Sequence, residues 1–202
     1  MKLLMKSLLC SLVLSLMIQM LTFSAQCHEI ENNVFRLHII ANSDNKYDQQ
    51  LKLCVRDRIL LHTKEMYSHA DNTAQARLYT TAELNDIERI AQRTVHENGY
   101  DYTVKAEVSN IYFPTREYEN YTLPAGNYDA LRIIIGEGKG HNWWCVMFPS
   151  LCLPSAEKSE DRENYFSNSQ KNIVTNGVKY KYKFKIVELF ESIRCRFSDN
   201  SK

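Results

Sequence analysis

One stretch of the sequence, residues 133–154, restricts the fold of this chain more than any other. It reads IIIGEGKGHNWWCVMFPSLCLP and joins two apolar runs through a glycine-rich segment. Both tryptophans of the chain, Trp143 and Trp144, stand side by side in it, next to Cys145. β-branched and aromatic residues favour strands, and alternating glycines favour a turn with positive φ angles. The stretch therefore predicts two strands joined by a tight turn, which we interpret as a hairpin.

The glycine-rich turn, residues 136–140, has a second interpretation as a phosphate-binding loop. Its backbone would approach a phosphate closely, and Lys139 would pair with the negative charge. A dinucleotide-binding fingerprint, however, needs a glycine where His141 stands and a helix after the loop. An apolar run follows instead, so we favour the hairpin turn.

The patterns along the rest of the chain predict an α+β fold. We expect a mixed, largely antiparallel sheet packed against two or three helices in a single domain. Three- and four-residue apolar spacing predicts one helix capped by Asn45 and another that starts near Thr80 and ends at Gly99. Alternating or β-branched apolar runs predict strands near residues 34–41, 102–109, 128–135 and 142–148.

The C-terminal part of the chain changes character twice. Charged, Asn and Ser residues crowd residues 155–177, which predicts a polar linker or loop. Lysines at alternate positions from Lys179 to Lys185 predict a strand with one basic face, either an edge strand protected from aggregation or a membrane-facing surface. Helical spacing from Ile186 to Phe197 predicts a terminal amphipathic helix.

The N-terminal residues predict a signal peptide or an N-terminal anchor. Lys2 and Lys6 give a positive start, and residues 8–23 carry no charge. That length is typical of a secretory signal and short for a spanning helix. Phe23 stands where an A-x-A cleavage site needs a small residue, so the anchor stays as the alternative.

These patterns divide the chain into four parts. We expect the signal or anchor in residues 1–27 and the main α+β domain in 28–154. The polar linker follows in 155–177, and a C-terminal strand and amphipathic helix in 178–202 pack on the domain. The formal net charge of +1 gives no sign of a nucleic-acid partner.

Cys145 has two interpretations. Export would place it where disulfides persist, and the Pro-Ser turn after it allows Cys152 to approach within the ~4.4–6.8 Å between Cα atoms that a disulfide needs. Alternatively, Cys145 is a nucleophile with His38 or His141 as its base. No Asn or Asp is obviously placed to orient either histidine. We therefore favour a disulfide between Cys145 and Cys152.

No other group of residues in the sequence predicts chemistry. The histidines are scattered, and neither an H-E-x-x-H nor a C-x-x-C motif occurs. We expect no catalytic set, no metal, no cofactor and no small-molecule substrate.

The paired tryptophans predict a contact surface instead. Neighbouring residues on a strand point to opposite faces, so one tryptophan should enter the core while the other faces outward or meets a second layer. An exposed Trp among other aromatic residues resembles a binding hot spot. The candidate partner contacts are Asn142, Trp143, Trp144, Phe113, Pro114 and Tyr118.

Two sets of short motifs resemble the stage II sporulation protein R family. The first set comprises RLH, ANSD, DQQLKL and VRD between Arg36 and Asp57. The second comprises LPAG, ALR, the alternating glycines, NWWCV, FP and LC between Leu123 and Cys152. The resemblance extends over roughly residues 34–153, and NWWC and LPAG are its most specific elements.

This resemblance implies a function in signalling. Members are exported from the forespore of an endospore-forming bacterium into the space between the forespore and mother-cell membranes. The implied partner is the membrane-embedded aspartyl protease of sporulation, which, once activated, cleaves the precursor of the early mother-cell sigma factor. Such a protein is not an enzyme and works close to a membrane surface. The alternatives are an exported thiol hydrolase that uses Cys145 and an envelope-binding module that uses the C-terminal lysines.

Overall fold

The computed structural model describes residues 2–118, 121–149, 166–175 and 180–189 of this chain. Its helices and strands are, in order, α1 (Lys2–Asn32), β1 (Phe35–Ile40), α2 (Lys46–Ser68), α3 (Thr73–Ala82), α4 (Leu84–Glu97), β2 (Val104–Phe113), β3 (Arg116–Glu117), β4 (Thr122–Leu123), β5 (Gly126–Ile135), β6 (Asn142–Phe148) and α5 (Asn168–Thr175). Residues 180–189 are also helical.

The chain divides into two compact units, each made from separate stretches of sequence. What we call the sheet unit comprises Asn32–Ile111 and Asn127–Tyr165. The α1 unit comprises Met1–Glu31, Tyr112–Gly126 and Phe166–Lys202. The predicted boundaries after residues 27, 154 and 177 stay predictions.

The sheet unit is built on four strands in the order β2-β5-β1-β6. β1 runs parallel to β5, with Leu37 opposite Leu131, and antiparallel to β6, with Leu37 opposite Cys145. The sheet is mixed and the predicted α+β class is confirmed. The predicted hairpin of β5 and β6 is wrong, because β1 lies between them.

The sequence of β1 explains why it takes this central place. All six residues of the strand, FRLHII, are buried. A strand that is buried on both faces belongs inside a sheet, where both of its edges are also paired. The connection from β5 to β6 must therefore pass the end of β1, which brings residues 136–141 onto the residues that follow β1.

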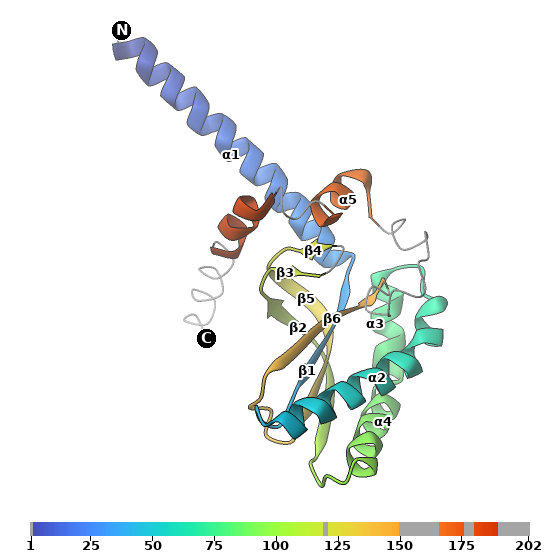
Figure 1. Ribbon diagram of the computed structural model, residues 1–202. Helices are drawn as coiled ribbons and strands as arrows, with labels where there is room; N and C mark the ends of the chain where they lie inside the picture. The colour runs from blue at the N-terminus through green and yellow to red at the C-terminus, as the bar shows by residue number, and fades with distance from the viewer. Residues whose placement is uncertain (1, 119–120, 150–165, 176–179, 190–202) are drawn as a thin grey trace, which may run out of the picture. The chain divides into compact units, whose positions relative to one another are not determined.

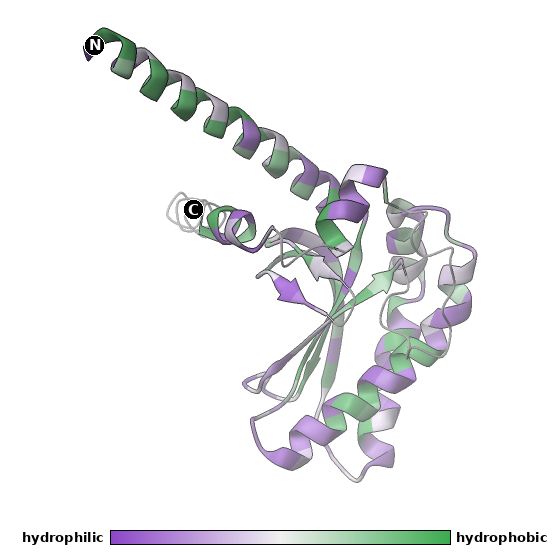
Figure 2. Ribbon diagram, turned by 45° about the horizontal axis from the view of Figure 1, so that its top comes forward, coloured by the Kyte–Doolittle hydropathy of each residue, from purple (hydrophilic) through white to green (hydrophobic). Residues whose placement is uncertain are grey.

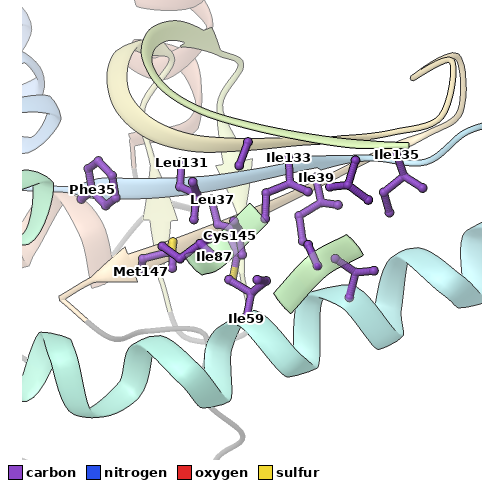
Figure 3. Packing of buried hydrophobic residues seen from close by; sticks show 14 of the residues in the cluster. Phe35, Leu37, Ile39, Ile59, Ile87, Leu131, Ile133, Ile135, Cys145 and Met147 are labelled. Carbon is purple, nitrogen blue, oxygen red and sulfur yellow. The ribbon is translucent and has the colours of Figure 1, made fainter. Parts of the chain in front are cut away.

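Helices α2, α3 and α4 cover one face of this sheet (Figure 1). β1 places Phe35, Leu37 and Ile39 toward them, and β5 adds Leu131, Ile133 and Ile135 (Figure 3). The helices meet these strands with apolar stripes at three- and four-residue spacing: Leu51, Val55 and Ile59 on α2, and Ile87, Ala91 and Val95 on α4. Fully burying one such side chain contributes about 1.5–3 kcal/mol, so this layer holds the sheet unit together.

The expected helix ends at Asn45 and Gly99 are confirmed, whereas the expected helix start near Thr80 is wrong, because Thr80 lies inside α3 and α4 begins at Leu84. Asn45 caps α2 by accepting a hydrogen bond from the Tyr47 backbone N–H at 3.0 Å. Gly99 has a φ of +83° just after α4, as expected of a glycine that ends a helix. The segment before it contains two helices, α3 and α4, which meet at Glu83.

Side chains of α4 close part of the outer edge of β2. Gln92 accepts a hydrogen bond from the Val104 backbone N–H at 2.8 Å, and Glu88 accepts one from the Ala106 N–H at 2.7 Å. Exposed strand edges invite pairing with other chains, and covered ones do not. The helix therefore protects the start of this edge strand.

The α1 unit contains small elements from distant parts of the chain. β3 and β4 form a two-stranded antiparallel sheet, with Arg116 opposite Leu123, and α5 lies inside the segment predicted as a polar linker. Residues 155–165 of that segment lie outside the described residues. The predicted lysine strand is wrong where the structure describes it, because residues 180–189 are helical. Burial of Phe184 and Val187 on one side of this helix outweighs the period-two pattern of the lysines.

α1 is apolar over most of its length (Figure 2). Within the described residues it is a helix long and apolar enough to cross a membrane, judged by length and composition. A signal sequence near the N-terminus has the same properties.

Candidate functional site

Two loops meet at the ends of β1 and β5. The first follows β1 and contains residues 41–45, and the second joins β5 to β6 and contains residues 136–141. The backbone N–H groups of Lys139 and Gly140 donate to the carbonyl oxygens of Asn42 and Ala41, at 3.1 and 2.9 Å. The Glu137 N–H donates to Asn42 Oδ1 at 3.0 Å. Each loop therefore holds the other, and the glycine-loop amides that a phosphate would need are used within the protein.

The glycines of the second loop are required by this close approach. Gly136 has a φ of +59°, as the sequence predicts for this turn. A Cβ atom at Gly136 would overlap the Asn42 side chain, and one at Gly140 would overlap the Ser43 carbonyl group. The loop is glycine-rich because it packs against residues 42 and 43.

The first turns of α2 fix the first loop through a buried carboxylate. Asp48 accepts hydrogen bonds from Asn42 Nδ2 at 2.9 Å and from Ser43 Oγ at 2.6 Å. Burial raises the pKa of the Asp48 carboxyl, but hydrogen bonds from Ser43, Asn42 and Tyr102 outweigh burial and hold the pKa below its ordinary value. Asp48 is therefore a charged structural group.

Lys52, one turn further along α2, fixes the second loop. Its Nζ donates to the His141 carbonyl at 2.8 Å and to Gln49 Oε1 at 2.6 Å. Burial lowers the pKa of the Lys52 ammonium group. The Lys52 side chain is buried, which is unusual for a lysine on a helix. We call residues 41–45, residues 136–141, Asp48, Gln49 and Lys52 the loop clasp.

The two tryptophans point to opposite faces of β6, as predicted. Trp143 packs against the core beneath the helices, and the Arg56 guanidinium carbon lies 4.4 Å from its ring centroid. Trp144 lies on the other face and stacks on His38, with 3.9 Å between ring centroids and 9° between planes. Trp143 therefore packs on the core beneath the helices, and Trp144 faces the other side of the sheet.

His38 links Trp144 to the start of β6. Its Nε2 lies 2.8 Å from Asn142 Oδ1, so Nε2 carries a proton and donates it to the amide oxygen. Burial lowers the pKa of His38 below its ordinary value, and the charges of Arg132 and Arg36 act in the same direction. His38 is buried, Trp144 is half-buried and Asn142 is exposed. These three residues form what we call the Trp144 patch.

The other candidate contacts belong to the α1 unit. Phe113 is fully buried. Pro114 and Tyr118 are half-buried, and the Tyr118 ring stacks on Tyr121 with 4.6 Å between centroids. The six candidates fall into two units, so the structure does not define one surface made of them all. The contact surface stays a prediction.

Cys145 lies in the core beneath the helices. The free cysteines among the described residues are Cys10, Cys27 and Cys54, and Cys145 is not one of them. Cys152 lies outside the described residues, so its pairing with Cys145 stays a prediction.

The geometry gives Cys145 no histidine base. His38 lies on the opposite face of the sheet, where it stacks on the residue next to Cys145. His141 is four residues away, which corresponds to roughly 13 Å along an extended strand, and its exposed ring contacts Asp44. In the part of the chain that the structure describes, no three His, Cys, Asp or Glu residues are grouped to hold a metal ion.

Sequence reasoning missed three charged side chains that the fold buries. Arg36 is fully buried, with its guanidinium carbon 4.8 Å from the Tyr128 ring centroid. Asp48 and Lys52 are buried as well. A sequence pattern could have indicated only Asp48 and Lys52. Their four-residue spacing at the start of α2 places them on one helix face, toward the loops.

Comparisons with known proteins identify the family. The family model for stage II sporulation protein R matches residues 31–158. The stage II sporulation protein R of Bacillus subtilis (strain 168) is 36% identical over 140 residues, which cover 66% of this chain and 62% of the relative. The match thus spans about three fifths of the length of that curated relative. No solved structure is significantly similar.

The family match includes both loops of the clasp and all of the Trp144 patch. The motifs ANSD and GEGKGHN, distant in sequence, are the two loops that hold each other, and NWW supplies Asn142 and Trp144. The chain therefore belongs to the stage II sporulation protein R family.

Proposed function

We propose that this protein is an exported sporulation signal that activates a membrane-embedded aspartyl protease of the mother cell by binding to it. The activated protease then cleaves the precursor of the early mother-cell sigma factor. The protein acts in the space between the forespore and mother-cell membranes. The observation that carries this proposal is the family match over residues 31–158, and the apolar helix α1 is compatible with export.

The arrangement of polar groups in the sheet unit favours binding over chemistry. The carboxylate of Asp48 and the ammonium group of Lys52 are engaged with the loops of the clasp. Cys145 lies in the core, on the opposite face from His38. A surface whose charged groups are held in place by hydrogen bonds suits a protein that is recognised by its partner.

The Trp144 patch is the part of the sheet unit that we assign to the protease contact. Trp and polar neighbours at a fixed position are typical of binding hot spots. Stacking on His38 fixes the Trp144 ring, and the hydrogen bond from His38 fixes Asn142. A preorganised ring loses little conformational entropy when a partner covers it.

Reconstitution in a bacterium that lacks sporulation proteins tests the proposal. The full chain, the aspartyl protease and the sigma precursor are produced together, and processing is followed by immunoblotting. Cleavage should require the chain, its export and an intact protease. If the folded chain is exported and the precursor stays uncut, the proposal is wrong.

A matched pair of variants tests the contact surface in the same assay. Trp144→Ala should weaken binding about 30-fold or more, as expected for the loss of a hot spot worth about 2 kcal/mol. Leu78→Ala removes an exposed apolar side chain from α3, on the helix-covered side, and should leave processing unchanged. If a folded Trp144→Ala variant is as active as the native chain, the Trp144 patch is not the contact surface.

A further inference from the structure

The exposure of α1 changes abruptly within one continuous helix. Its apolar side chains are exposed from Leu3, at 85%, to Leu21, at 70%, apart from the half-buried Met20. Phe23, Cys27 and Ile30 are then buried, with Phe23 exposed by only 3%. Their spacing of four and three residues places these three on one face of the helix. The first part of α1 is therefore largely uncovered by the residues that the structure describes, while its last turns belong to a folded core.

Aromatic residues from the C-terminal part of the chain form this core around Phe23. The Phe23 ring lies 5.7 Å from the Tyr180 ring and 5.6 Å from the Phe184 ring, measured between centroids. The Lys183 ammonium nitrogen lies 5.3 Å from the Phe23 centroid. We call Phe23, Tyr180, Lys183 and Phe184 the Phe23 cluster.

Polar contacts hold the next turns of α1 in the same unit. Gln170 of α5 is buried and donates to Glu29 at 3.1 Å. The Glu31 side chain occupies the space beside Gly126, where a Cβ atom would overlap it. Gly126 is the glycine of the LPAG motif. Burial also raises the pKa of the Cys27 thiol to about 12, in keeping with a core position.

A signal peptide that is cut off has no need of such contacts. Cleavage after Ala25, the first alanine after the apolar run, would remove Phe23 and expose the buried Phe184 ring. The large Phe23 side chain also stands at the position where an A-x-A site needs a small one. Phe23 thus packs against the helix of residues 180–189 and also makes the cleavage site unfavourable.

The exposed part of α1 fits a lipid bilayer in length and in charge. Residues 3–22 extend about 30 Å as a helix, which equals the thickness of the hydrocarbon core. Lys2 and Lys6 lie at one end, and a lysine near the end of a spanning helix reaches the headgroups with its long side chain. Positive residues favour the cytoplasmic side, so the folded units would lie on the other side.

We propose that α1 is retained in the mature protein as a membrane anchor, with residues 3–22 in the bilayer and residues 23–31 as part of the α1 unit. The anchor holds the signalling protein at the membrane through which it was exported. The identity of that membrane rests on the proposed function, whereas the retention of α1 does not.

Phe23 offers a direct test, because Phe23→Ala creates the sequence Ala-Ser-Ala at residues 23–25. The native full chain, Phe23→Ala and Phe23→Leu are produced in a bacterium that exports them. Intact mass, and partition between membrane and soluble fractions after a high-salt and alkaline wash, are measured for each. The native chain and Phe23→Leu should keep α1 and stay with the membrane. Phe23→Ala should lose residues 1–25 and become soluble.

Each contrary result overturns the inference in a defined way. A native chain that lacks residues 1–25, or that leaves the membrane on washing, would show that α1 is a cleaved signal. Release of Phe23→Leu would show that a large side chain at residue 23 does not protect the chain from cleavage. Neither protease nor sigma precursor is present in this experiment, so its result is independent of the processing assay.

Discussion

The loop clasp and the Phe23 cluster both hold segments whose positions the sequence pattern does not predict. The clasp does so with polar contacts and the cluster with aromatic packing. In the clasp, Asp48 and Lys52 are buried and satisfied by short hydrogen bonds to the two loops. In the cluster, Phe23 and Phe184 are buried against each other as aromatic rings. A buried polar group loses stability when its hydrogen-bond partner is removed, whereas a buried ring can be replaced by an apolar side chain of similar size. The clasp should therefore tolerate few substitutions, and the cluster should tolerate those that keep size.

The largest effect is expected in the cluster when volume is lost. Phe184→Ala should destabilise the α1 unit by about 3–5 kcal/mol, because it leaves a cavity beside Phe23. Phe184→Leu, which fills much of that space, should cost less than half as much. Tyr182→Ala serves as the control, since Tyr182 is exposed on the same helix. Hydrogen exchange of the full chain in detergent micelles measures the loss. Equal protection in Phe184→Ala and Tyr182→Ala would contradict the assigned packing.

The clasp should respond almost as strongly to the loss of one carboxylate. Asp48→Ala leaves the Asn42 amide and the Ser43 hydroxyl without their acceptor, at an expected cost of about 3 kcal/mol. Asp57→Ala on the same helix removes an exposed carboxylate that pairs with Arg56, and should change stability by less than about 1 kcal/mol. Urea unfolding of both variants measures the difference. Similar midpoints would mean that Asp48 contributes no more than a surface charge.

Glycine substitutions separate close packing from backbone strain within the sheet unit. Gly136→Ala places an alanine at a positive φ of +59° and also makes its Cβ atom overlap Asn42. It should destabilise the folded chain by about 2–4 kcal/mol. Gly99→Ala has only the positive φ, because nothing lies within 4 Å of the added Cβ atom, and should lose about 1–2 kcal/mol. Thermal unfolding compares the two. A larger loss of stability in Gly99→Ala than in Gly136→Ala would show that the second loop does not pack closely against Asn42.

The clasp and the cluster also differ in how much of them the sequence predicts. Positive φ angles in the glycine loop follow from local composition, and the opposite directions of Trp143 and Trp144 follow from strand geometry. The wrong hairpin shows the limit of local reasoning, because the position of β1 between β5 and β6 depends on a strand about a hundred residues earlier. Burial of Lys52 depends on the same topology, which brings the His141 carbonyl to α2.

In the Phe23 cluster, local patterns point away from the observed structure. Alternate lysines from Lys179 to Lys185 predict a strand, yet residues 180–189 are helical. Phe184 and Val187, three residues apart, form the buried face. Lys181 and Lys185 are exposed, and Lys183 lies beside the Phe23 ring. An apolar N-terminal run predicts a discarded leader or an anchor, and nothing in that run reveals that Phe23 meets residues near the other end of the chain.

The smallest expected effect concerns the pH response of the Trp144 patch. Burial lowers the pKa of His38 below 6.5; the hydrogen bond to Asn142 opposes the shift, and the charges of Arg132 and Arg36 add to it. The unfolded chain thus binds this proton more readily, so the stability from neutral His38 is complete above about pH 6.5 and is lost as the pH falls toward the lower, folded-state pKa. His38→Gln, which keeps an amide donor for Asn142, should flatten the fall in stability between about pH 7 and 5. Asp48 titrates below 3.8 and lies outside this window. An unchanged slope in urea titrations across this range would show that His38 titrates as freely in the folded chain as in the unfolded one.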